Sequence, residues 1–572
     1  MALQQQRDGR AHDEFETLAK FYAKDSAQEL GKYKALRDLD VFVLDNSIRE
    51  STVAQLRGHT LDDKWKLYEE VQKCGFQNKI VANFSEMTLV DDEFVRQLIS
   101  NGEDRRGMFA FTEVTEGSRE GVLDKETVPV GLRRMKELGL WNPLLEVNLA
   151  EGAYNLLHCP IEDLLALLEK WIVWAHEHLH PETRVLVNLR DLPDAMPDSA
   201  HRVFRAVDFL ARLPATLRPI GILFEEYKGL CMPEECGLWA KYIRQIMDAN
   251  NWQGHLLVHV HEKFGFCYAS QIQSLIGGAD GIWGSVCFES AGLGSASACV
   301  TLMNLVRLGN KKITQAFNST YLRRAAINVT KITTGFDPYS KTPVYGEQAL
   351  DHVFDLKKEE FDLADFFCER APVRISTMAS EEMICTHLVE LFGEDPQFTV
   401  KQANRMRMVM EEDLRHNRKE EYMSTVGVAL LFKKAGGSLT KKMKEVIHKM
   451  ELGKPHAVNL ISQVRKMWDT WLVADEVNGN GDALELESFY SGFMAPYFPS
   501  FDRCLDTKWT LHALDLEEND RVRWADFQVY LTWAMHQYPD IKDAQELLDV
   551  TFRNGIVPSI RHSMVSVDPT AS

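Results

Sequence analysis

Eight short apolar runs recur along the first half of the chain, and each is followed by a stretch with the spacing of an amphipathic helix. The runs lie at residues 41–45, 79–83, 108–113, 144–148, 184–190, 219–225, 256–261 and 280–286. Short apolar runs that alternate with helical segments are typical of buried parallel strands. Eight such units in about 270 residues predict an α/β fold of the TIM (β/α)8 barrel type. A doubly wound open sheet is the alternative interpretation.

The length of 572 residues exceeds what one hydrophobic core usually supports, so several domains are expected. We predict a helical leader at 1–37, the barrel at 38–310, a helical post-barrel region at 311–437 and a further helical domain at 438–572. The last boundary follows the turn at Gly436-Gly437, after which amphipathic helices are interrupted by two acidic, Asn-rich loops.

Composition restricts the expected partners. A net charge of −19 argues against nucleic-acid binding, because phosphate recognition needs clustered Lys and Arg. No apolar run approaches the roughly 18 residues of a membrane span, and the first residues lack the apolar core of a signal peptide. The 10 cysteines include no CxxC pair, which favours reduced, mostly buried thiols. We therefore expect a cytoplasmic protein without membrane or nucleic-acid partners.

Two short motifs point to a metal site. Arg49-Glu50 closes the first predicted strand, and His259-Val260-His261 closes the seventh. Residues i and i+2 of a strand share one side, so both imidazoles would face the same way. Because barrel chemistry takes place at the carboxyl ends of the strands, we predict Glu50, His259 and His261 as ligands of a divalent metal such as Mg, Mn or Zn. Taken singly, an Arg-Glu pair is more often a surface ion pair.

The flanking sequences VFVLDNSIRESTVAQLRGHTLDDK and GHLLVHVHEKFGFCYASQIQSLIGGADGIWGSVCFESAGLG resemble barrel strands of the HMG-CoA-lyase-like superfamily. This superfamily includes HMG-CoA lyase, isopropylmalate and homocitrate synthases and 4-hydroxy-2-oxovalerate aldolase. The resemblance implies a metal-assisted carbon–carbon lyase or Claisen/aldol-type acyltransferase acting on a 2-oxo acid or acyl-CoA. It implies Arg49 as the catalytic group that stabilises an oxyanion. Segment 333–356 resembles the family's post-barrel linker, which makes His352 a candidate acid/base.

The sequence departs from that family at several positions. The family motif D-x-T-L-R-D-G reads Asp45-Asn46-Ser47-Ile48-Arg49-Glu50-Ser51, with a longer carboxylate in place of the ligand Asp. Cys299 stands where the family keeps an Asn. Two hypotheses follow: a divergent metal-dependent enzyme, or a catalytically silent barrel that serves as a calcium-binding regulatory or scaffold protein. The oligomeric state stays open, and a homodimer is compatible with the resemblance.

The two acidic loops resemble an EF-hand pair. Loop 515–527 places oxygen donors at positions 1, 3, 5 and 12 of the calcium pattern, and the predicted ligands are Asp515, Glu517, Asn519 and Asp526. Loop 475–487 has a less regular register, and its predicted calcium ligands are Glu476, Asn478, Asn480 and Glu487. Asp526, at position 12 of loop 515–527, is shorter than the usual Glu, which should weaken calcium binding or favour magnesium.

Overall fold

The computed structural model describes residues 2–49, 59–84, 89–116, 118, 122–151, 159–350, 361–369, 371, 375–415, 424–448, 455–474, 482–496, 513–516, 521–538 and 541–556. The chain forms two compact units, which are Met1–Ala349 with Phe361–Glu369, and Leu350–Glu360 with Arg370–Ser572. The division predicted at 37, 310 and 437 stays a prediction. Among the helices described, none has the length and apolar character that a membrane span requires.

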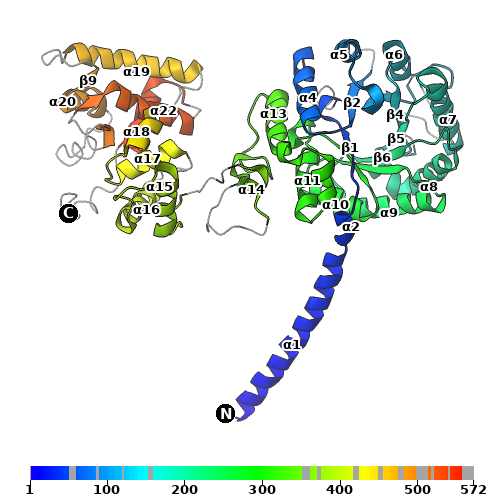
Figure 1. Ribbon diagram of the computed structural model, residues 1–572, viewed down its shortest axis with the longest axis horizontal. Helices are drawn as coiled ribbons and strands as arrows, with labels where there is room; N and C mark the ends of the chain where they lie inside the picture. The colour runs from blue at the N-terminus through cyan, green and yellow to red at the C-terminus, as the bar shows by residue number, and fades with distance from the viewer. Residues whose placement is uncertain are drawn as a thin grey trace. The chain divides into compact units, whose positions relative to one another are not determined.

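Eight parallel strands of the first unit close into a barrel in the order of the sequence (Figure 1). They are β1 (Phe42–Asp45), β2 (Asn78–Asn83), β3 (Met108–Glu113), β4 (Asn142–Asn148), β5 (Leu186–Arg190), β6 (Gly221–Glu226), β7 (His255–Val260) and β8 (Gly281–Gly284). The predicted barrel is thereby confirmed, and the open-sheet alternative is wrong because β8 pairs with β1.

Helices alternate with these strands and surround them. They are α4 (Leu61–Lys73), α5 (Leu89–Ser100), α6 (Val130–Leu138), α7 (Ile161–His178), α8 (Leu192–Arg212), α9 (Pro233–Ala249), α10 (Cys267–Ile276) and α11 (Ala298–Arg307). Among the described residues of this unit, α1 (Ala2–Gly31) and α2 (Lys34–Arg37) precede the barrel, and α12 (Lys311–Ala316), α13 (Leu322–Thr334) and α14 (Leu363–Phe367) follow α11.

Local sequence signals set the ends of several of these helices. Thr60 begins α4 with a capping box, in which its hydroxyl accepts the N–H of Asp63 and the Asp63 carboxylate accepts the N–H of Thr60. Gly139 ends α6 in the left-handed conformation, with φ of 75°. Such caps direct the chain from each helix back into the next strand.

Ring closure depends on a small residue in β8. Gly281 lies opposite Phe42 of β1, and a Cβ added at Gly281 would come within 2.9 Å of the Phe42 carbonyl oxygen. Any larger residue there would push β1 and β8 apart. Glycine therefore allows the close backbone approach on which the closed hydrogen-bonding ring depends.

A layer of apolar side chains fills the middle of the barrel. Its fully buried members are Leu44, Ile80, Phe109, Phe111, Leu144, Leu186, Leu223, Leu257 and Trp283. Each comes from a different strand except the two phenylalanines, which both lie on β3. The barrel interior is therefore a packed core rather than a pore, and it forms a floor beneath the carboxyl ends of the strands.

The second unit is mainly helical. Its helices are α15 (Glu381–Phe392), α16 (Val400–Arg415), α17 (Thr425–Lys434), α18 (Lys441–His448), α19 (Pro455–Ala474), α20 (Leu486–Phe489), α22 (Trp524–Gln537) and α23 (Ala544–Val550). Two short antiparallel strands pair within it, β9 (Ala483–Leu484) and β10 (Val522–Arg523). One hydrophobic core joins residues from Ile375 to Ile556, on both sides of position 437.

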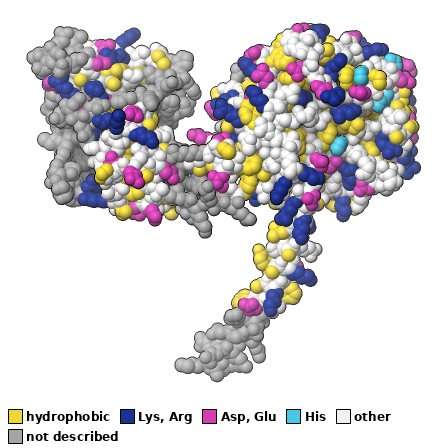
Figure 2. All heavy atoms as spheres, in the orientation of Figure 1, with side chains coloured by type: hydrophobic (Ala, Val, Ile, Leu, Met, Phe, Trp, Pro, Cys, Tyr) yellow, Lys and Arg dark blue, Asp and Glu magenta, His cyan; other side chains and the backbone are white. Residues whose placement is uncertain are grey.

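Charged side chains of both signs are interspersed on the drawn face of the barrel unit (Figure 2). Lys and Arg lie beside Asp and Glu there, with hydrophobic side chains scattered between them. On this face neither sign of charge is gathered in one patch among the residues drawn in colour. A strong acidic cluster occurs instead inside the barrel mouth.

Candidate metal centre

Polar side chains form the layer above the apolar floor, next to the carboxyl ends of the strands. The last apolar interior residues on β3 to β7 are Phe111, Leu144, Leu186, Leu223 and Leu257. Two positions further along the same strands lie Glu113, Glu146, Asn188, Glu225 and His259. Side chains two apart on a strand share one face, so all five polar residues point into the barrel. Barrel enzymes of this type carry their catalytic groups at this end.

Glu225, His259 and His261 bring three metal-ligand atoms together. One ligand atom of each residue lies within 4.8 Å of the others. The Nε2 atoms of the two histidines are 3.0 Å apart, and His261 Nε2 is 3.5 Å from Glu225 Oε1. Two imidazoles and a carboxylate are a donor set that suits Zn, Fe or Mn. The residues present therefore fit a divalent metal ion.

The orientation of His259 is fixed by the backbone behind it. His259 Nδ1–H donates to the carbonyl oxygen of Trp283 over 2.9 Å, and the His259 ring stacks on the Trp283 ring at 4.3 Å. This hydrogen bond places a proton on Nδ1 and directs Nε2 toward His261. Metal-binding histidines are commonly held by such a contact to their second nitrogen. His259 is thus oriented as a ligand by its surroundings.

Electrostatics keep the Glu225 carboxylate ionised. Burial alone would raise its pKa, but the hydrogen bond with His261 and the nearby charges of His259, His261 and Arg49 hold the pKa at about 2. Ionised carboxylate is the form that binds a metal. The centre therefore has its anionic ligand available at all ordinary pH values.

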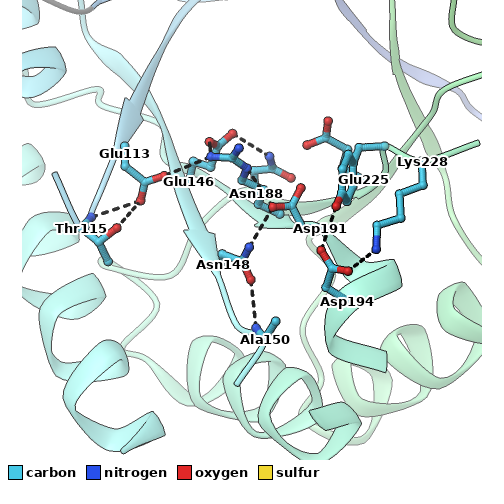
Figure 3. A network of polar contacts seen from close by, with 12 residues as sticks. Glu113, Thr115, Glu146, Asn148, Ala150, Asn188, Asp191, Asp194, Glu225 and Lys228 are labelled. Carbon is cyan, nitrogen blue, oxygen red and sulfur yellow. Dashed lines mark hydrogen bonds and ion pairs between the residues drawn. The ribbon is translucent and has the colours of Figure 1, made fainter. Parts of the chain in front are cut away.

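Carboxylates from β3 and β4, and that of Asp191 just after β5, line the other side of the mouth. We use the name acidic wall for Arg190 together with Glu113, Glu146, Asn188 and Asp191, which are labelled in Figure 3. Arg190 Nη1 lies 3.1 Å from Glu146 Oε1 and 3.6 Å from Glu113 Oε2, and Arg190 Nε lies 3.1 Å from Asp191 Oδ2. Three carboxylates thus share one guanidinium group, which is 42% exposed at the mouth.

Two carboxyl groups of the acidic wall titrate near neutral pH. Burial, followed by the charges of Glu113 and Glu225, raises the pKa of Glu146 to about 7. Burial also raises the pKa of Asp191 to about 6, against the opposing charge of Arg190. A carboxyl group with a pKa near the working pH can both donate and accept a proton. Glu146 is therefore a suitable general acid or base.

The ring of Phe111 supports the guanidinium group of Arg49 at the centre of the site. The guanidinium carbon of Arg49 lies 4.1 Å from the centre of the Phe111 ring, and Phe111 contacts Trp283 at 5.5 Å. A guanidinium over an aromatic face is held by the electrons of the ring. Arg49 also lies close enough to Glu146 and Glu225 to lower the pKa of each. It is thus positioned between the metal ligands and the acidic wall.

The structure brings together three of the residues expected from sequence, which are Arg49, His259 and His261. Glu50 and His352 lie outside the described residues. Sequence reasoning missed Glu225, Glu146 and the rest of the acidic wall. The missed signal was the polar residue two positions after the last interior apolar residue of each strand. With the strand faces assigned, that pattern identifies Glu113, Glu146, Asn188 and Glu225, but it does not identify Arg190 and Asp191, which lie further along the chain.

Of the predicted calcium ligands, Asp515 and Asp526 are described with their side chains, and Glu487 is placed in α20. Glu476, Asn478, Asn480, Glu517 and Asn519 lie outside the described residues. Beside the two loops, β9 pairs with β10 through Leu484 opposite Val522. Asp526 is fully buried, and its two oxygens accept hydrogen bonds from Arg523 Nη2 at 2.8 Å and Nε at 3.0 Å. Arg523 thus pairs with the carboxylate that was predicted as the calcium ligand at position 12.

No protein-family model matches the sequence, and no curated protein matches it. Among solved structures, HMG-CoA lyase from Brucella melitensis is 14% identical, with a TM-score of 0.41 over 52% of this chain and 99% of that chain. Hydroxymethylglutaryl-CoA lyase from Pseudomonas aeruginosa is also 14% identical, with a TM-score of 0.41 over 53% and 96%. The carboxyl transferase domain of Rhizobium etli pyruvate carboxylase is 13% identical, with a TM-score of 0.37 over 74% and 62%. Such distant likeness concerns the fold alone, so function must be argued from the side chains.

Proposed function

We propose that the barrel binds a divalent metal ion, Zn, Mn or Mg, through His259, His261 and Glu225. The observation that carries this proposal is the approach of three ligand atoms to within 4.8 Å at the carboxyl end of the barrel. Charge supports it as well. The Glu225 carboxylate, whose pKa is held at about 2, would be the anionic ligand of that ion. Glu50, predicted as a ligand from sequence, would supply a further carboxylate.

We propose a carbon–carbon lyase or Claisen/aldol-type acyl transfer on a 2-oxo acid or acyl-CoA as the reaction. A bound divalent ion would polarise the oxygen on which negative charge develops. Arg49, held over Phe111, would bind the same anionic part of the substrate. Glu146, with its pKa near 7, would move the proton. The apolar floor would exclude water from below. His352 is the other candidate acid/base.

Elemental analysis of the full chain, purified without added metal, tests this proposal. We expect about one Zn, Mn or Mg per chain, and loss of that metal in the double variant His259→Ala/His261→Ala. His255→Ala is the matched control, because His255 lies on the same strand but pairs with Asp280 at its opposite end. The control should keep the metal. A wild-type protein without metal, or a double variant that retains it, would overturn the proposal.

Metal-loaded protein should then be screened with 2-oxo acids, alone and with acyl-CoA thioesters. Turnover that is lost with the metal in the double histidine variant supports the enzyme hypothesis. The alternative is a catalytically silent barrel in a calcium-binding scaffold protein. That alternative predicts calcium bound by the second unit and no metal in the barrel.

We also propose that the second unit contains an EF-hand pair. The observation that favours it is the short antiparallel pairing of β9 with β10, because paired calcium loops are joined by such a contact. The bidentate contact between Arg523 and Asp526 supports weak calcium binding, since Arg523 competes for the same two oxygens. Asp482 is likewise engaged by Arg465 at 2.7 Å.

Removing Arg523 is expected to tighten calcium binding at least about tenfold, because the oxygens of Asp526 would become available. Isothermal titration calorimetry of the full chain with Arg523→Ala measures this change. Arg415→Ala serves as the control, since Arg415 is 67% exposed at the end of α16. An unchanged affinity in Arg523→Ala would rule out the competition, and micromolar binding by the wild type would contradict the expected weakness.

A further inference from the structure

Two loops beside the metal-ligand residues expose large apolar side chains. The loop at 227–232 joins β6 to α9, and the loop at 261–266 joins β7 to α10. We use the name apolar rim for Leu230, Met232, Phe264 and Phe266, whose exposed fractions run from 38% at Phe266 to 61% at Phe264. Both loops, and the neighbouring connections from β5 to α8 and from β8 to α11, lie in the stretch 159–350, of which every residue is described.

The four side chains form one surface, because the two loops lie side by side. A Cβ added at Gly229 would come within 2.7 Å of the backbone nitrogen of Lys263, so the two backbones touch at this point. Leu230 and Phe264 are the next residues of the two loops. The other two rim residues are the N-cap residues of α9 and α10, which pack against each other. The rim is thus continuous across both loops.

Hydrogen bonds within each loop hold the rim in place. The Glu226 carboxylate accepts the N–H of Leu230 at 3.3 Å. In the other loop, the Glu262 carboxylate accepts the N–H of Gly265 and, at 3.2 Å, the N–H of Cys267. The exposure of the rim is therefore built into the conformation of these loops. Contiguous apolar side chains exposed in this way mark sites of interaction.

The size of the rim favours a small occupant over a protein. Side chains of this kind offer about 200 Å² each when fully exposed, so four that are about half exposed present roughly 400 Å². A stable protein–protein interface buries about 800 Å² on each partner. The rim offers about half of that area, which suits the apolar part of a ligand better than a second protein surface.

The rim also lies close to the candidate metal centre. Phe264 is three residues after His261, so bond lengths keep their Cα atoms within about 11 Å of each other. Between them, the N–H of Glu262 donates to the carbonyl oxygen of Gly294 at 3.0 Å, which ties this loop to the one that follows β8. A ligand whose head lies at the metal centre therefore reaches the rim with a tail of several carbon atoms.

We propose that the apolar rim binds the aliphatic tail of a carboxylate ligand. The tail would lie on the four rim side chains and lose its contact with water there, which is favourable for both surfaces. The carboxylate head would lie at Arg49 and the metal ligands, and this orientation rests on the proposed function. Tail binding rests on the rim residues themselves. The inference narrows the proposed substrate to a carboxylate that carries an aliphatic chain of several carbons.

Calorimetry of the full chain with unbranched alkanoates, from butanoate to decanoate, tests the proposal. We expect the Kd to fall about threefold to fourfold for each methylene that reaches the rim, as burial of a CH₂ group implies. Phe264→Ser should remove most of this dependence and leave the Kd of butanoate unchanged. Tyr242→Ser is the matched control, because Tyr242 is 49% exposed but lies about 13 Å along α9 from its first residue. The control should keep the wild-type dependence.

The outcomes separate this inference from the proposed function. A Kd that does not change with chain length, or no binding even of decanoate, overturns the tail site, whether or not elemental analysis of the same sample shows one metal per chain. A dependence that Phe264→Ser leaves intact is equally contrary. A dependence that Phe264→Ser weakens, in wild-type protein without metal, overturns the metal proposal and keeps the tail site. A dimer in sedimentation that Phe264→Ser dissociates would mean that a second copy covers the rim, and the ligand assignment would be wrong.

Discussion

Replacing Lys64 by methionine is expected to lower the free energy of unfolding of the barrel by about 3–5 kcal/mol. Lys64 and Asp91 form an ion pair of 2.8 Å in which neither side chain is exposed. Lys64 also donates to the carbonyl oxygen of Ile48 at 3.1 Å, and Asp91 accepts the N–H of Asn83 at 2.8 Å. The variant would leave the buried Asp91 carboxylate without its cation.

This pair also affects the site, because Ile48 directly precedes Arg49. Hydrogen exchange of peptides from β1 to β3 in the full chain would measure the loss separately from the second unit. Lys66→Met is a matched control on the same helix, since Lys66 pairs with Asp62 at the surface, and no measurable change is expected. The double variant Lys64→Met/Asp91→Asn should recover part of the loss. Equal stabilities of Lys64→Met and Lys66→Met would refute the buried-pair argument.

The second large effect is a loss of barrel stability as pH rises, caused by Asp45. The side chain is fully buried, and burial raises its pKa to about 7 despite hydrogen bonds from the N–H and hydroxyl of Ser47. In the unfolded chain the same group ionises near pH 4. Between about pH 4 and 7 the unfolded state therefore loses this proton first. Since the unfolded state then binds fewer protons, the free energy of unfolding falls as pH rises.

A pKa difference of about three units corresponds to a fall of roughly 4 kcal/mol in the free energy of unfolding. This fall is complete above about pH 7 and has not begun below about pH 4. Asp45→Asn should remove this pH dependence, making the variant more stable than wild type at pH 8 and slightly less stable at pH 5. Hydrogen exchange of the same peptides across this range provides the measurement. Asp40→Asn, an exposed change just before β1, should follow the wild-type profile. Parallel profiles for wild type and Asp45→Asn would exclude Asp45 as the cause.

The strand positions could be read from sequence because their signal is local. Five of the eight observed strands begin within one residue of the expected position, and the other three, β4, β5 and β6, begin two residues away. At β5 the expected strand began at 184, but the Arg184 N–H donates to the side chain of Asn142 and the strand begins at Leu186. A side-chain contact from the neighbouring strand β4 takes the place of a ladder hydrogen bond there. Periodicity carries no information about such a contact.

The candidate site was likewise predictable from the sequence only in part. His259 and His261 share a face because they are two residues apart on one strand, so sequence sufficed to pair them. Glu225 precedes His259 by 34 residues, and only the pairing of β6 with β7 places it beside the histidines. The hydrogen bond from His259 to Trp283 likewise depends on β8 lying next to β7.

The sequence by itself determined which segments are strands, which are helices, and that two imidazoles lie on one strand face. These properties follow from the backbone geometry of a few consecutive residues. Only the tertiary structure decided the metal-ligand group and the acidic wall, because closing eight strands into a ring sets which of their inward residues become neighbours. It also decided the charge states. Burial raises the pKa of Glu146, whereas His261, His259 and Arg49 lower that of Glu225 although it is buried as well.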